Sequence, residues 1–173
     1  MTPEHNRGAS TPLALTFRDR VQPGDAEGVR SLVAATGYFT DAEVDVAMEL
    51  VVERLKLGAA SGYYFVFAET RGKLAGYACY GPIACTVASF DLYWIAVDPT
   101  LQRGGVGSAI LREVEQRVRA AGGGAIYIDT SNKPQYASTR GFYLRSGYEQ
   151  VALLKDFYAP HDDKVIYAKQ GIR

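Results

Sequence analysis

The chain has few of the residues on which several protein classes depend. Among its 173 residues are two cysteines, Cys79 and Cys85, and two histidines, His5 and His161. Two cysteines are too few for a disulfide framework, and two histidines do not complete the ligand spacing of a zinc site. The sequence therefore predicts a reducing, cytoplasmic location and no metal centre.

Net charge and long apolar segments are also missing. Nineteen basic residues balance nineteen acidic ones, so no overall positive field favours nucleic acid or an anionic membrane. The longest uncharged run, at 74–90, contains glycine and proline and is shorter than the about 20 apolar residues of a membrane span. We expect neither nucleic acid nor a membrane as a partner, and a homodimer is left open.

The length and composition are typical of one globular domain. Hydrophobic residues make up 47% and charged residues 22%, close to the averages for soluble proteins, and a domain usually has about 100–200 residues. Residues 1–12 are polar and contain no apolar signal segment. We interpret 1–12 as a disordered leader and 13–173 as a single domain.

Hydrophobic periodicity predicts a mixed order of strands and helices. Residues Thr40 and Glu43 form a capping box that opens the second helix, and the apolar strand at 91–97 is followed by a helix and another apolar strand, as in a parallel βαβ unit. The expected strands are 13–17, 63–68, 74–80, 91–97, 125–130, 148–154 and 164–169, and the expected helices run from Asp25 to Gly37, from Thr40, from Val106 and over 137–145.

The most informative segment precedes the helix that begins at Val106. Gly104, Gly105 and Gly107 allow backbone N–H groups to converge without obstruction by Cβ atoms, and the helix N-terminus adds a partial positive charge. Arg103 adds a full one. We therefore interpret this segment as a pyrophosphate site, with a plain glycine turn as the alternative.

The glycine pattern does not by itself identify the phosphate ligand. The pattern GxxxxGK[ST] of nucleotide triphosphatases is absent. The dinucleotide pattern GxGxxG is matched in part, because Gly105 and Gly107 precede a helix and Asp129 ends the next strand, but Ile110 occupies the third glycine position. An oxidoreductase that uses a nicotinamide dinucleotide is therefore kept as an alternative function.

Two segments together resemble a known family. Gln102-x-x-Gly105-x-Gly107, after a strand that ends in IAVDP at 95–99, is similar to the coenzyme A loop of the GNAT family of N-acetyltransferases, whose pattern is [QR]-x-x-G-x-[GA]. The segment FYLRSGY at 142–148 resembles that family's aromatic-Tyr-x-x-x-Gly-aromatic segment.

The order of strands and helices also resembles the family from 13 to 169. This resemblance implies an α/β (α+β) fold with one mixed, mostly antiparallel sheet of about seven strands and helices on both faces. The strands at 91–97 and 125–130 would form its central parallel pair. In the family these two strands splay apart, and the pantetheine arm of coenzyme A lies in the gap.

The resemblance implies acetyl-CoA as co-substrate and no metal. It assigns the pantetheine to strand backbone groups, the pyrophosphate to the amides of 103–108, and a side-chain contact to Asn132, for which a turn position is an equally good account. The implied cofactor-binding residues are Ile95, Val97, Gln102, Arg103, Gly104, Gly105, Val106, Gly107, Ser108 and Asn132.

The implied reaction is direct transfer of the acetyl group to a primary amine of a small molecule or peptide. Tyr143 resembles the family's acid for the departing thiolate, because a phenol with a pKa of about 10 stays protonated where a thiol of about 8.5 ionises. Packing beside Phe142 is the alternative role. Asp91 is the candidate general base, with Asp129 or a water relay as alternatives.

The acceptor amine is not specified by any motif. Tyr38 and Phe39 lie in a loop between two helices, where they either contact the substrate or pack on the core. We interpret them as substrate-binding residues. Together with the acids of 158–163 these aromatics suit a small cationic amine. A non-catalytic acyl-CoA sensor remains a further alternative, although a sensor does not need Tyr143 as a proton donor.

Overall fold

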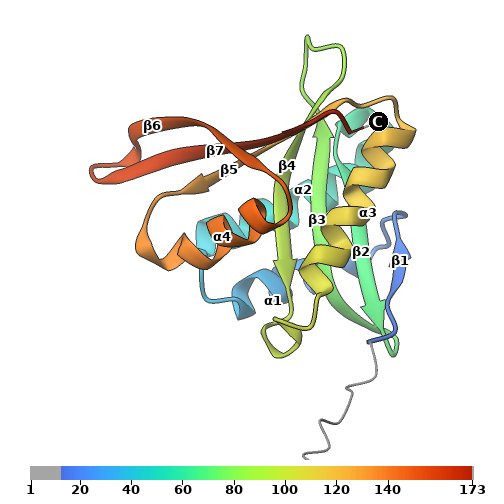
Figure 1. Cartoon of the computed structure of the whole chain (residues 1–173). Coiled ribbons are helices and arrows are strands. Elements are labelled where there is room, and N and C mark those ends of the chain that lie inside the picture. Colours follow the sequence, from blue (N-terminus) through green and yellow to red (C-terminus); the bar gives the residue numbers. More distant parts are fainter. Residues whose placement is uncertain (1–12, 173) are drawn as a thin grey trace, which may run out of the picture.

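The computed structural model describes residues 13–172 as one seven-stranded sheet with helices on both faces (Figure 1). The leader expected at 1–12 lies outside the described residues, and the domain boundary at 13 stays a prediction. The elements, where η marks a short 3-10 helix, are β1 (Thr16–Arg18), α1 (Asp25–Ala35), α2 (Asp41–Leu57), η1 (Gly58–Ser61), β2 (Tyr64–Thr70), β3 (Lys73–Pro82), β4 (Ser89–Val97), η2 (Pro99–Leu101), α3 (Val106–Ala120), β5 (Ala125–Ser131), η3 (Pro134–Tyr136), α4 (Ala137–Arg145), β6 (Glu149–Ala159) and β7 (Asp162–Gln170).

The strand order is β1-β2-β3-β4-β5-β7-β6. Every neighbouring pair is antiparallel except β4 and β5, which are parallel. The expected mixed, mostly antiparallel sheet with a central parallel pair is therefore confirmed. None of the helices within 13–172 is long and apolar enough to cross a membrane.

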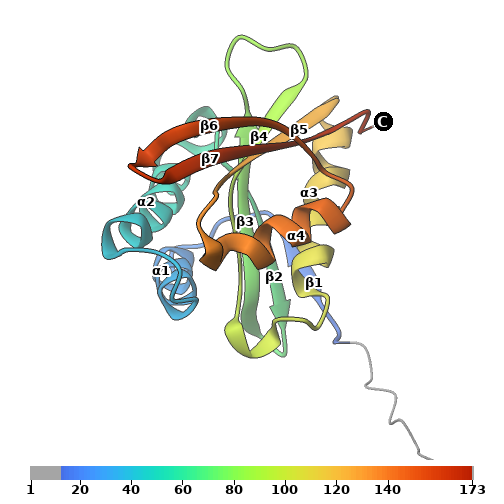
Figure 2. The ribbon, with the colours of Figure 1, turned by 60° about the vertical axis from the view of Figure 1, so that its left-hand side comes forward.

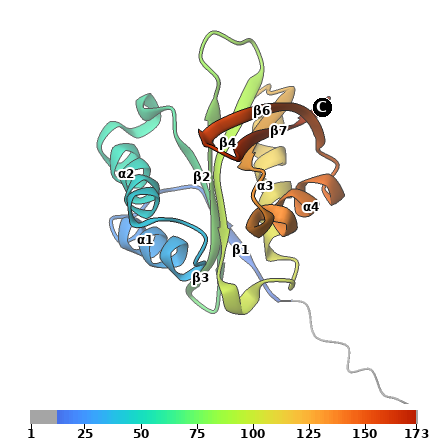
Figure 3. The same cartoon turned by 90° about the vertical axis from the view of Figure 1, so that its left-hand side faces the viewer.

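Helices α1 and α2 pack on one face of the sheet, and α3 and α4 lie on the other (Figure 3). Val33 and Val51 are buried between the first pair and the sheet. Ile110 and Val114 are buried on the opposite face. Helix α3 approaches β3 closely because Gly76 has no side chain, and a Cβ atom there would lie 2.7 Å from the Cδ1 atom of Ile110.

Most of the expected elements are present with small changes at their ends. The Thr40–Glu43 capping box opens α2 as predicted. Strand β1 is shorter than expected because only Thr16–Arg18 pairs with β2, while the residues before it pack on the core without pairing. Helix α1 begins at Asp25 as predicted, with Gly24 as its N-cap, and the Asp25 carboxylate accepts hydrogen bonds from Arg18.

Hairpin β6–β7 is longer than the sequence indicates. Both strands extend to a tight connection where Ala159 pairs with Asp162. The tip of this hairpin points toward the α2 side of the molecule (Figure 2). It therefore reaches the region between the helical layers.

The parallel strands β4 and β5 are paired along only part of their length. Register pairs run from Ser89–Ala125 to Leu92–Ile128 and then stop. At the same level the β3–β4 register shifts and leaves Tyr93 as an extra residue of β4. Such a bulge bends a strand and increases its twist, so β4 turns away from β5 beyond Leu92. The two strands leave a slot at their C-terminal ends.

Candidate active site

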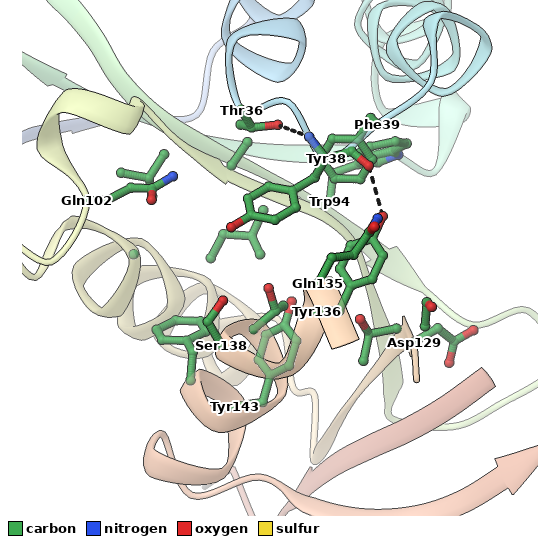
Figure 4. Close-up of a pocket in the computed structure, with 18 of the residues that line it drawn as sticks. Thr36, Tyr38, Phe39, Trp94, Gln102, Asp129, Gln135, Tyr136, Ser138 and Tyr143 are labelled. Atoms are coloured by element: carbon green, nitrogen blue, oxygen red, sulfur yellow. Dashed lines mark hydrogen bonds between the residues drawn. The ribbon is translucent and has the colours of Figure 1, made fainter. Parts of the chain in front are cut away.

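A cleft of about 950 Å³ opens where β4 and β5 separate. Its walls come from six parts of the chain: the α1–α2 loop, the end of β4, the start of α3, the end of β5 with η3, helix α4, and the tip of hairpin β6–β7. Figure 4 shows side chains from the α1–α2 loop, β4, β5, η3 and α4 around one space. The cleft therefore joins both faces of the sheet at one slot.

One end of the cleft is formed by the N-terminus of α3. Gly105 is its N-cap with φ +81°, and no side chain caps this end. The first helical hydrogen bond runs from the Ala109 N–H to the Gly105 carbonyl, so the N–H groups of Val106, Gly107 and Ser108 have no acceptor within the helix. These groups and the helix dipole make a site for an anion.

Seven of the ten predicted cofactor residues line the cleft: Ile95, Val97, Gln102, Arg103, Gly105, Gly107 and Ser108. Three do not. Gly104 donates its N–H to the Leu101 carbonyl at 3.3 Å, and the Val106 side chain is buried in the core. Asn132 is exposed and donates its N–H to the Asp163 carbonyl at 2.9 Å, as a turn residue does.

The backbone of β4 presents free hydrogen-bonding groups to the slot. The Asp98 N–H donates to the Ala75 carbonyl of β3 at 2.9 Å. Because peptide groups in a strand alternate in direction, the polar groups of Val97 and Ile95 point away from β3. Beyond Leu92 they have no register partner in β5. An extended ligand chain can therefore pair with them.

Tyr143 lies at the wall of the cleft and points into it from α4 (Figure 4). The residue is only 4% exposed, and its ring packs against Phe142 and Tyr167 with centroids 5.3 and 5.9 Å apart. Burial raises the pKa of the phenol above its ordinary value, because an apolar environment disfavours the phenolate. The hydroxyl therefore keeps its proton at neutral pH.

Aromatic side chains form the other end of the cleft. Tyr38 and Phe39 both line it, as do Trp94 and Tyr136. The Phe39 ring lies 4.9 Å from Trp94 and packs on the α1–α2 core, whereas Tyr38 is 37% exposed and lies 5.9 Å from Tyr136. The Tyr136 hydroxyl donates to the Tyr38 carbonyl at 3.1 Å (Figure 4), which fixes the loop across the cleft.

Three carboxylates lie at this aromatic end, those of Glu43, Asp129 and Asp162. Asp129 forms an ion pair with Lys164, and Asp162 forms one with Lys133 at 2.9 Å. Burial and then the charges of Asp129 and Asp162 are the main causes that raise the pKa of Tyr158, which also lines the cleft, to about 12. Two of the three carboxylates are thus paired with lysines, and that of Glu43 forms no ion pair with the residues of 13–172.

The comparison with protein families agrees with this geometry. The Acetyltransferase (GNAT) family model matches residues 32–148. This chain belongs to the GNAT family.

Individual relatives share the fold over most of this GNAT chain. It is similar to a GNAT-family structure from Desulfovibrio desulfuricans, with 50% identity, a TM-score of 0.91, and coverage of 92% of this chain and 100% of the other. A structure of an aminoglycoside 6'-N-acetyltransferase complexed with coenzyme A has 18% identity, a TM-score of 0.72, and coverage of 92% and 97%. At that identity the likeness concerns the fold.

One curated relative is the N-alpha-acetyltransferase RimI of Mycobacterium tuberculosis. The two sequences are 29% identical over 96 residues, which is 55% of the GNAT chain and 58% of the relative. The match thus spans less than two thirds of that relative's length.

In this GNAT protein the candidate base Asp91 does not line the main cleft. It lines a separate hollow of about 350 Å³, together with Tyr127 and Asp129. Burial and the neighbouring carboxylate of Asp129 raise the pKa of Asp91, while Lys164 lowers it. Asp129 lines both the hollow and the cleft. The structure therefore brings Asp129, rather than Asp91, to the other candidate residues.

Several cleft residues of the GNAT protein are absent from the sequence prediction. Trp94 was assigned only to a strand interior and Glu43 only to a capping box, while Tyr136 had no assigned role. The sequence around Trp94 and Glu43 contains no signal that these residues line a cleft, because their place in the cleft depends on the separation of β4 from β5. The prolyl turn that precedes Tyr136 indicates a chain reversal at the strand end and is the one available signal. Among residues 13–172, no three His, Cys, Asp or Glu side chains are grouped as metal ligands are.

Proposed function

We propose that this protein transfers the acetyl group of acetyl-CoA directly to a primary amine. The observation that carries the proposal is the slot itself. An uncapped helix N-terminus, unpaired strand backbone and a protonated phenol line one continuous cleft. These are an anion site, a site for an extended chain and a proton donor, and their combination matches the parts of an acyl thioester cofactor.

The residues present fit acetyl-CoA. The N–H groups at the start of α3 would hold the pyrophosphate, with the Arg103 side chain beside them, because Arg103 and Gly105 both line the cleft. The backbone of Ile95 and Val97 would hold the pantetheine, since it has no partner in β5. The cofactor would supply an acetyl group activated as a thioester.

Transfer forms a bond from the amine nitrogen to the acetyl carbon and breaks the carbon–sulfur bond. The sulfur leaves with the electron pair and takes a proton, which Tyr143 would donate, since it lines the cleft. The nitrogen loses one proton. Asp129 lines the cleft and is our candidate to accept it, directly or through water; Asp91, in contact with the same hollow, remains the alternative. A strand N–H of β4 would polarise the thioester carbonyl.

The acceptor is an amine of a small molecule or a peptide. The names of the relatives support both classes, since one is an N-alpha-acetyltransferase and another an aminoglycoside 6'-N-acetyltransferase. A cytoplasmic location and a homodimer stay predictions.

The two alternative functions find no support. A dinucleotide-binding fold has a doubly wound parallel sheet, whereas only β4 and β5 are parallel here. A sensor without activity would not need a proton donor at the slot, where Tyr143 lies.

The experiment has two parts. Acetyl-CoA is expected to raise the melting temperature, because a ligand at 100 times its Kd stabilises a protein by about 2.7 kcal/mol; NAD and ATP serve as controls. Release of free thiol is then measured with acetyl-CoA and a panel of primary amines. Binding of NAD in preference to acetyl-CoA, or binding of acetyl-CoA with no thiol release for any amine class, would contradict the proposal.

A further inference from the structure

The cleft has a different charge at each end. Arg103 and Arg145 both line the cleft, and Arg103 lies two residues before Gly105, the N-cap of α3. At the aromatic end Asp129 and Asp162 are each neutralised by a lysine. Glu43 has no ion pair with any residue of 13–172. Lys133, which pairs with Asp162, also lies near enough for the charge of Glu43 to raise its pKa. With two lysines facing three carboxylates, one negative charge remains at this end, and Glu43 is the carboxylate without an ion pair.

Glu43 is held in place although it is exposed. Its Oε2 atom accepts hydrogen bonds from the Thr40 N–H and the Thr40 hydroxyl, both at 2.8 Å. No donor among the described residues contacts its Oε1 atom. The capping box thus fixes one oxygen of this carboxylate and leaves the other for a ligand, at little further cost in side-chain entropy.

Aromatic rings share this end of the cleft with Glu43. Tyr38, Tyr136 and Tyr158 all line it, and two of these rings lie 5.9 Å apart. The charge of Glu43 contributes to the raised pKa of both Tyr136 and Tyr158, as expected if these groups face one space. Aromatic faces with a carboxylate are a favourable environment for an organic cation.

Glu43 and Tyr143 approach the slot from opposite faces of the sheet. Glu43 belongs to α2 on one face, and Tyr143 belongs to α4 on the other (Figure 3). An amine that entered the slot from the α2 side would keep the rest of its molecule near Glu43, because Glu43 lines the cleft on that side. The group that Glu43 meets is therefore a part of the acceptor other than the reacting nitrogen.

Resting on the proposed function, we infer that the acceptor carries a second, positively charged group and that Glu43 binds it. The substrate class is then a diamine or a polyamine-like cation. A neutral monoamine would leave Glu43 unpaired, and an acceptor with a carboxylate at this place would be repelled.

The test compares matched acceptors that differ in charge. Linear diamines with three to six carbons are paired with n-alkylamines of equal length, and kcat/KM is measured for each. Binding of the same compounds in the presence of coenzyme A is measured by calorimetry. Glu43→Gln removes the charge and retains the cap, because glutamine at this position also accepts from the N-cap backbone. Glu49→Gln, an exposed position of α2 outside the cleft, is the control.

We expect at least one diamine to exceed its alkylamine partner about fivefold to tenfold, in kcat/KM and in affinity, as a charge-assisted contact provides. Glu43→Gln should bring this ratio close to one, whereas Glu49→Gln should retain it. Equal binding of diamines and alkylamines, or a ratio unchanged by Glu43→Gln, would overturn the inference. Charge-dependent binding without thiol release from any amine would support this site and count against the proposed acetyl transfer.

Discussion

Tyr143 has a buried ring and lines the cleft on its α4 side. Tyr143→Phe retains the ring packing and removes only the hydroxyl, so we expect kcat to fall by about 10²–10⁴-fold, the usual contribution of general acid catalysis. Acetyl-CoA affinity should change little. Steady-state kinetics and calorimetric titration measure the two effects, and a donor with a more acidic thiol should partly restore turnover.

Tyr77→Phe is the matched control. The Tyr77 hydroxyl is buried on the α1–α2 face and has no hydrogen-bond partner among the described residues. Its removal should leave kcat unchanged and stability equal or higher, since an unpaired buried hydroxyl is unfavourable. Turnover of Tyr143→Phe as high as that of Tyr77→Phe would exclude the proton-donor role.

Gly105 has two functions that substitution can separate. Its φ of +81° favours glycine, and it lines the anion end of the cleft. Gly105→Val should destabilise the fold by about 1–2 kcal/mol through backbone strain and also reduce the melting-temperature shift caused by acetyl-CoA. Gly122→Val, at the other end of α3 with φ +80° and open space around it, should cost similar stability and keep the shift. Equal shifts for both variants would place the cofactor elsewhere.

At the scale of elements, the two aromatic residues of the α1–α2 loop, Tyr38 and Phe39, are expected to have different roles. Tyr38→Ala should raise the KM for the amine several-fold without a loss of stability, because Tyr38 is exposed toward the cleft. Phe39→Ala should also lower the melting temperature, since this ring packs on Trp94 and the α1–α2 core. Kinetics and thermal melts of both variants check the distinction. A KM unaffected by Tyr38→Ala would leave this loop a structural role only.

Asp162, at the tip of hairpin β6–β7, connects this hairpin to the end of β5. Its carboxylate accepts from the Ser131 hydroxyl at 2.5 Å and pairs with Lys133, and these contacts lower the pKa of Asp162. The folded protein therefore binds this proton less readily than the unfolded chain. Stability from Asp162 is complete above the ordinary aspartate pKa of about 3.9 and is lost as the pH falls through the lower, folded value.

Asp162→Asn should accordingly lower the melting temperature by a few degrees at pH 7, with the difference from the unsubstituted protein vanishing in strongly acidic solution. Asp45→Asn is the control, because its ion pair with Arg30 is exposed and such pairs contribute little. Thermal melts from pH 2 to 7 measure both. A constant difference across this range would contradict the proposed ionic contact.

Patterns of neighbouring residues predict individual helices and strands better than they predict where two strands separate. The Thr40–Glu43 box, the glycine run before α3 and the helix at 137–145 were visible because each depends on neighbouring residues. The bulge at Tyr93 was not, because it is a property of the β3–β4 pairing. The place of Trp94 in the cleft was therefore missed, and Asp91, the candidate base, lines the neighbouring hollow while its role stays a prediction.

At the scale of the whole molecule, the residues that line the cleft come from both helical layers and from hairpin β6–β7. Tyr143 comes from one helical layer and Tyr38 from the other, and the hairpin tip adds Tyr158. The family resemblance could predict that strands separate here, since it concerns the order of elements. It could not predict which acidic and aromatic side chains meet, because those contacts join residues about 100 positions apart, as Tyr38 and Tyr136 show.

Four register pairs between β4 and β5 join the strands β1 to β4 to the strands β5 to β7. The sheet thus has two parts that are joined only through the first residues of β4 and β5. An extended chain bound in the slot would connect the unpaired C-terminal ends of these two strands. Amide hydrogens of Ile95 and Val97 should then exchange rapidly with solvent in the free protein and slowly with coenzyme A bound. Those of the β2–β3 pair should exchange slowly in both states. Equal protection of the slot amides in both states would mean that the bound chain does not pair with β4.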